Sequence, residues 1–82
     1  MNKEAVCKEI AKIIEENLVI SSETIHGDSR LMEDLGASSF DIMMLLPKIE
    51  ETYKIEFSVR ALRNMITIDD ILEYIEQQSK TV

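Results

Sequence analysis

A loop runs into a helix in the stretch Asp34-Leu35-Gly36-Ala37-Ser38-Ser39-Phe40-Asp41. Gly36 allows the backbone to change direction sharply just before the helix. Ser38 is well placed as the N-cap, and Asp41, three residues on, completes a capping box in which Asp replaces Glu. Ser39 then falls in the first helical turn, exposed at the end of the loop. The stretch therefore predicts a helix that begins at Ser39 and a serine that faces solvent.

The apolar residues of the chain recur mostly at helical spacing. We expect helices at about 3–18, 39–53, 58–64 and 68–77, the third being short and capped by Ser58, the fourth capped by Thr67. The expected core stripes are Val6, Ile10, Ile13, Ile14 and Leu18, then Ile42, Leu45, Leu46, Ile49 and Tyr53 with Met43 at one edge, then Ile68, Ile71, Leu72 and Ile75. The order predicts an all-α bundle of three main helices and one short helix.

A long loop, at about 19–37, separates the first two helices and is rich in turn-forming residues. Five apolar side chains should hold it against the core, namely Ile20, Ile25, Leu31, Met32 and Leu35. A loop of this length in a compact domain is often functional. Pro47 falls inside the second helix and costs on the order of 3 kcal/mol there. Because the apolar stripe keeps its phase from Ile42 to Tyr53, we expect one kinked helix rather than two segments.

Length and composition limit the number of domains, the partners and the cellular location that we expect. The chain has 82 residues, which predicts a single domain over residues 1–82, and its 9 basic and 16 acidic residues give a formal charge of −7. This balance argues against nucleic acid as a partner and favours proteins with basic docking patches. The only cysteine is Cys7, so no intramolecular disulfide can form. No apolar run has the length of a signal or approaches the roughly 20 residues of a membrane span, so we expect no membrane association and a cytoplasmic location. We also expect a monomer.

The sequence offers no evident catalytic or metal site. No histidine lies near Ser39 to act as its base, and the GxSxG motif is absent. His26 lies in the long loop without a cysteine or second histidine for a metal site, so we interpret it as a surface residue. We interpret Cys7 as a small residue at the edge of the first core stripe. A serine that another enzyme modifies fits better than a self-activated nucleophile, and we expect no enzyme activity.

Residues 28–53 resemble the acyl and peptidyl carrier proteins. The signature of that family is a leucine-glycine-small residue lead-in followed by Asp-Ser-Leu. Here it reads Leu35-Gly36-Ala37, then Ser38-Ser39-Phe40, then the acid Asp41. The resemblance implies that a phosphopantetheinyl transferase moves 4′-phosphopantetheine from coenzyme A to Ser39. It also implies that the arm carries an acyl or aminoacyl group as a thioester between enzymes of fatty-acid, polyketide or related biosynthesis.

One position departs from the family pattern. The residue before the modified serine is Asp in the family and Ser38 here. Both residue types cap helices well, but a negative charge that a modifying enzyme could contact is lost. Two adjacent serines could accept the arm, and we favour Ser39 because the downstream sequence aligns with it. An unmodified carrier-fold interaction module remains the alternative, and a hydrolase that uses Ser39 is a third hypothesis.

The outer face of the second helix carries an apolar ridge, formed by Phe40, Met44 and Pro47 at i, i+4 and i+7. In carrier proteins this face docks onto partner enzymes and is usually more acidic. The predicted docking residues are Phe40, Asp41, Met44, Pro47, Lys48 and Glu51. Scattered surface apolar residues are the alternative interpretation.

A cavity between the second helix and the later helices is also possible. Its expected lining is Met43, Leu46, Met65, Ile66 and Ile68, although ordinary core packing explains these residues equally well. Arg60 and Arg63, on the short helix, are candidates for contact with the phosphate of the arm or with a partner. Solvated charge is the alternative.

Overall fold

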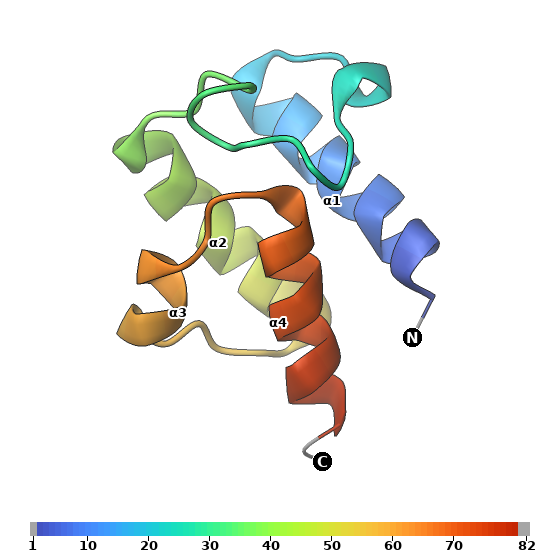
Figure 1. The fold of residues 1–82 in the computed structure, drawn as a ribbon, viewed down its shortest axis with the longest axis vertical. Coiled ribbons are helices and arrows are strands. Elements are labelled where there is room, and N and C mark those ends of the chain that lie inside the picture. Colours follow the sequence, from blue (N-terminus) through green and yellow to red (C-terminus); the bar gives the residue numbers. More distant parts are fainter. Residues whose placement is uncertain (1, 81–82) are drawn as a thin grey trace.

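The computed structural model describes residues 2–80 and shows a helical bundle (Figure 1). Its elements are α1 (Lys3–Leu18), the 3-10 turn η1 (Ser22–Thr24), α2 (Ser39–Tyr53), α3 (Val59–Arg63) and α4 (Ile68–Lys80). Residues 2–80 contain no strand, only an isolated antiparallel bridge between Arg30 and Thr67. The predicted all-α bundle with one short helix is confirmed, and α4 continues one turn beyond the predicted end at Gln77.

Side-chain caps explain where the helices begin. The Asn2 carboxamide oxygen accepts a hydrogen bond from the Ala5 amide, at 3.1 Å, at the start of α1. Ser58 caps α3 through the Ala61 amide, also at 3.1 Å. Thr67 and Asp70 form a reciprocal pair at the start of α4: the Asp70 amide donates to Thr67 Oγ1 (3.3 Å), and the Thr67 amide donates to Asp70 Oδ2 (2.8 Å). Each cap satisfies an amide that the helix leaves unpaired.

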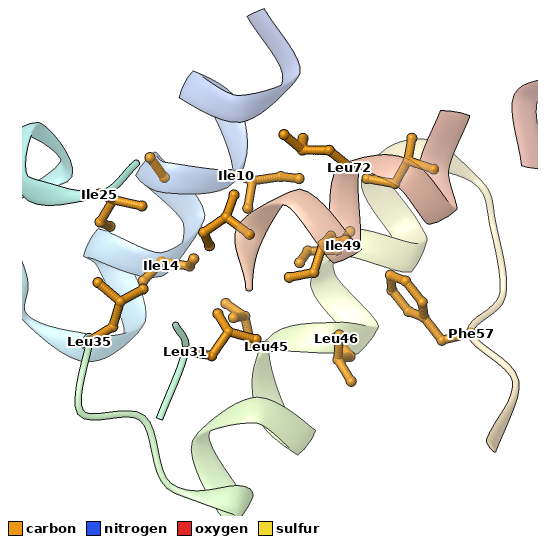
Figure 2. Packing of buried hydrophobic residues seen from close by; sticks show 14 residues of the cluster. Ile10, Ile14, Ile25, Leu31, Leu35, Leu45, Leu46, Ile49, Phe57 and Leu72 are labelled. Atoms are coloured by element: carbon orange, nitrogen blue, oxygen red, sulfur yellow. The ribbon is translucent and has the colours of Figure 1, made fainter. Parts of the chain in front are cut away.

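The core lies where α1, α2 and α4 meet (Figure 2). Nine large side chains are at most 2% exposed: Ile10, Ile14, Leu31, Leu45, Ile49, Ile68, Ile71, Leu72 and Ile75. All but Leu31 belong to the predicted stripes, which are thus confirmed in their main members. Val6, Ile13, Leu18, Ile42 and Tyr53 pack against this core and are half-buried. Phe57, from the segment before α3, adds an aromatic contact with Tyr74 of α4, with ring centroids 5.0 Å apart.

The long loop crosses the end of the bundle at which α2 and α4 begin (Figure 1). Ile25, Leu31 and Leu35 are buried in the core, as predicted, but Met32 is 50% exposed, so the expectation for Met32 was wrong. Leu31 takes the inward position, and the adjacent Met32 points away. Three backbone hydrogen bonds join the loop to residues 66–69: Leu31 N to Ile66 O, Ile68 N to Ser29 O, and Asp69 N to Gly27 O.

The second helix passes through Pro47 without a break. It is a single element from Ser39 to Tyr53, which confirms one helix rather than two segments. The proline ring lies on the exposed face of α2. None of the helices in the described part of the chain is long and apolar enough to cross a membrane.

Helices α1 and α2 end at residues with left-handed backbone conformation, Val19 (φ 53°) and Lys54 (φ 54°). This conformation is common at helix ends, where glycine usually provides it. It costs L-residues roughly 1–2 kcal/mol, and a β-branched residue is especially unsuited to it. The Val19 side chain is 95% exposed, so it contributes little packing in return.

We therefore expect Val19→Gly to raise the free energy of unfolding by about 1 kcal/mol, because relief of backbone strain outweighs the added chain entropy. Urea unfolding followed by circular dichroism measures the change. Val19→Ala is the control: it keeps Cβ, so its stability should stay within about 0.5 kcal/mol of the parental protein. Equal effects of the two substitutions would contradict the strain argument.

Candidate functional site

The capping box predicted at the start of α2 is present. The Asp41 amide donates to Ser38 Oγ (3.1 Å), and the Ser38 amide donates to Asp41 Oδ2 (2.9 Å). The Ser38 hydroxyl also donates to Asp41 Oδ2, at 2.9 Å. Ser38 is therefore engaged as both donor and acceptor in ending the loop and beginning the helix.

Ser39 differs from Ser38 in its surroundings. It is the first residue of α2 and is exposed, and its hydroxyl makes no hydrogen bond within residues 2–80. A substituent on Ser39 Oγ would leave the capping box intact, whereas a substituent on Ser38 Oγ would remove the donor to Asp41 and crowd the cap. The geometry thus gives a physical reason to prefer Ser39, which the sequence favoured only by alignment.

The loop before Ser39 is held in place by several contacts. Gly36 has φ +72°, a left-handed conformation that favours glycine. The next residue, Ala37, is buried, and its amide donates to Leu31 O at 2.9 Å. Arg30 forms an ion pair with Glu33, and its guanidinium contacts both Asp34 oxygens at 3.0 Å. The hydrogen bonds from Arg30 lower the pKa of the Asp34 carboxyl, which shows that they stabilise its charged form.

A groove of about 350 Å³ opens beside Ser39, between α2 and the α3 region. Its lining comprises Met32, Ser39, Ile42, Met43, Leu46, Leu62, Arg63, Met65 and Ile66. Four of the five predicted lining residues are present; Ile68 is not, because it is fully buried in the core. Met43 lies 71% exposed on the groove rather than at the core edge. Met32, Ile42 and Leu62 were not predicted to line the groove, because helical spacing does not show which face of α3 meets α2.

Neither a histidine nor a carboxylate lines the groove within residues 2–80. His26 lies elsewhere, on a separate hollow of about 410 Å³ between α1 and the loop, which Cys7 also lines. That shared position was not expected from the sequence. Burial and the Asp69 carboxylate raise the pKa of the Cys7 thiol, which keeps the thiol protonated. Among the described residues, no side chain that lines the groove could act as a base for Ser39.

The apolar ridge lies on the exposed face of α2. Phe40 and Met44 are 70% and 54% exposed, and Pro47 and Glu51 are exposed too. The two other predicted docking residues are engaged within the protein. The Asp41 carboxylate belongs to the capping box, and the Lys48 ammonium donates to Asn17 Oδ1 of α1 at 2.6 Å. Exposure of the ridge is thus confirmed, while its docking role stays a prediction.

The residues around Ser39 fit a phosphopantetheine arm. An exposed hydroxyl without an internal partner is accessible for modification. The start of a helix favours the negative charge of a phosphate. The adjacent groove offers apolar walls beside Ser39.

Comparison with known proteins agrees with this geometry. The family described as "Phosphopantetheine attachment site" matches residues 8–75. The chain is 42% identical over 72 residues to the acyl carrier protein of Phytoplasma mali, covering 88% of this chain and 86% of that protein. It is 32% identical over 76 residues to the acyl carrier protein of Campylobacter curvus, covering 93% of this chain and 99% of that protein. The helical fold, the exposed serine at the start of α2 and these matches over most of the chain agree. The chain belongs to the phosphopantetheine-binding family of acyl carrier proteins.

Proposed function

We propose that this protein carries an acyl or aminoacyl group on a 4′-phosphopantetheine arm attached to Ser39 and presents it to enzymes of fatty-acid, polyketide or related biosynthesis. The arm supplies a terminal thiol that holds the cargo as a thioester. The observation that carries the proposal is the difference between the two serines. Ser38 Oγ is engaged in the cap, and Ser39 Oγ is exposed and unpaired among the described residues.

In this function the chain's own residues position the arm and shield its cargo, and they catalyse no reaction. Gly36, the Ala37–Leu31 hydrogen bond and the capping box fix the direction in which Ser39 leaves the loop. The groove provides apolar walls, three of them methionines that adapt to irregular shapes. An apolar chain placed against these walls would be partly removed from water, which is favourable by about 25 cal/mol per Å² of apolar surface buried.

The proposed partners are a phosphopantetheinyl transferase and acyl-transferring or synthase enzymes with basic docking patches. A net charge of −7 would steer the protein toward such patches. The ridge of Phe40, Met44 and Pro47 would then enter an apolar socket. The cytoplasm remains the compartment that the sequence predicts.

An unmodified interaction module is the second candidate. It rests on Ser38, which replaces the family's Asp, and on the exposed ridge, which could serve binding without any arm. The two functions differ in one covalent bond at Ser39, so mass measurement separates them.

Co-expression with a broad-specificity phosphopantetheinyl transferase should add one phosphopantetheinyl group to the parental protein and to Ser38→Ala, and none to Ser39→Ala. Intact-mass spectrometry reads the result directly. The Ser38→Ala variant is expected to lose about 1 kcal/mol of stability with its cap, so its folding is checked by circular dichroism. No gain of mass in any sample would favour the unmodified module.

Ser38→Asp should speed attachment of the arm by the same transferase about two- to fivefold, because it restores a charge that a basic side chain of the enzyme can contact. The initial rate with coenzyme A measures the effect. Ser38→Asn is the matched control, since Asn caps helices as well as Asp does and adds no charge. A rate equal to that of the control would mean that the transferase does not rely on charge at this position.

Phe40→Asp should leave the helix content unchanged, because the side chain is 70% exposed, and should raise the KM of the transferase for this protein about tenfold. Val19→Asp introduces the same charge at the 95% exposed end of α1 and should leave that KM unchanged. Loss of folding in Phe40→Asp would instead place Phe40 in the core, and equal KM values in the two variants would remove the ridge from docking.

A further inference from the structure

Among the described residues, Arg63 is the only charged one that lines the groove beside Ser39. Apart from Ser39 itself, every other lining residue is apolar. Arg63 is the last residue of α3, and Asn64 caps that helix. Ser39 of α2 and one cation, Arg63 of α3, therefore line the same groove.

The Arg63 guanidinium has no ion pair within residues 2–80. Arg30, by contrast, pairs with both Glu33 and Asp34. The chain has 16 acidic residues against 9 basic ones, so an arginine without an acidic partner is not explained by a shortage of carboxylates. Arg60, on the same helix, is also unpaired among the described residues, but it does not line the groove.

The start of α2 contributes a second favourable element. Within residues 2–80 the amides of Ser39 and Phe40 donate no hydrogen bond, while the Asp41 amide is used by the cap. A negative charge on Ser39 Oγ would lie next to these amides and the positive end of the helix dipole. Arginine suits such a charge, because its planar guanidinium binds phosphate oxygens in a bidentate manner and remains ionised at all relevant pH values.

We propose that Arg63 binds the phosphodiester anion that attachment of the arm places on Ser39, and so directs the first part of the arm over the groove between α2 and α3. The inference rests on the proposed function, because the anion exists only after Ser39 is modified. Arg63 is a positioning residue in this scheme: it touches the phosphodiester and does not take part in transfer of the cargo.

The test compares four proteins, each prepared without and with the arm and verified by intact mass: parental, Arg63→Gln, Arg63→Lys and Arg60→Gln. At low ionic strength, attachment should raise the Tm of the parental protein and of Arg60→Gln by about 2–4 °C, as expected for one partly exposed ion pair. Arg63→Gln should lose this rise, Arg63→Lys should keep part of it, and about 1 M salt should suppress it in the three proteins that show it. An equal rise in Arg63→Gln and Arg60→Gln would overturn the proposal.

A second readout does not depend on stability. In ¹H–¹⁵N spectra, attachment of the arm should shift the Arg63 side-chain Nε–H resonance, while that of Arg60 stays in place. The ³¹P resonance of the arm should differ between the parental protein and Arg63→Gln but not between the parental protein and Arg60→Gln. Unshifted Arg63 signals would overturn the proposal even if the variants differ in Tm.

Two further outcomes separate the possible failures. If no protein gains mass, the proposed function itself fails. If all gain mass and neither readout responds to Arg63→Gln, only the role of Arg63 fails. The cargo itself could supply the anion if it ended in a carboxylate, so the arm is also loaded with acyl groups that end in methyl or in carboxylate. An effect of Arg63→Gln seen only with the carboxylate would assign Arg63 to the cargo and overturn the phosphodiester assignment.

Discussion

The reciprocal pair of Ser38 and Asp41 is the interaction on which the rest of the site depends. It ends the loop, sets the first turn of α2 and occupies the hydroxyl of one serine while leaving that of the next exposed. Capping residues contribute about 1 kcal/mol to a helix, so this pair is modest in energy. Its importance is geometric, because a shift of one residue in the helix start would exchange the roles of the two serines.

The cap can act in this way only because the loop before it is itself held. Buried Leu31 and Leu35 anchor the loop in the core, and backbone hydrogen bonds join it to the start of α4. The same bonds bring Ile66 and Met65 close to Met32, so one side of the groove is built from the segment that leads into α4. Core burial, loop path and groove shape are therefore one connected arrangement, and Ser39, the proposed attachment site, lies where its parts meet.

Periodicity and capping chemistry predicted most of the fold, because both act over a few residues. The inward stripes of α1, α2 and α4 and the caps Ser38, Ser58 and Thr67 follow from residue type and spacing alone. Three expectations failed: Met32 against the core, Met43 at the core edge and Ile68 in the cavity lining. Their burial depends on how α2, α4 and the loop approach one another. The engagement of Lys48 with Asn17, 31 residues earlier in the chain, is a tertiary contact that no local pattern contains.

The replacement of the family's Asp by Ser38 changes the electrostatics of the site more than its shape. The cap is kept, but its only carboxylate is that of Asp41, which already accepts from the Ser38 amide and hydroxyl. In a chain of net charge −7, the first turn of α2 thus carries a single acid, and the nearest charge lining the groove is the unpaired Arg63. An additional negative group on Ser39 would therefore have one carboxylate in the same helical turn, which the cap already engages, and Arg63 across the groove. This local balance of charge is the feature from which we infer an anion site, in a protein whose net charge of −7 is otherwise unfavourable to anions.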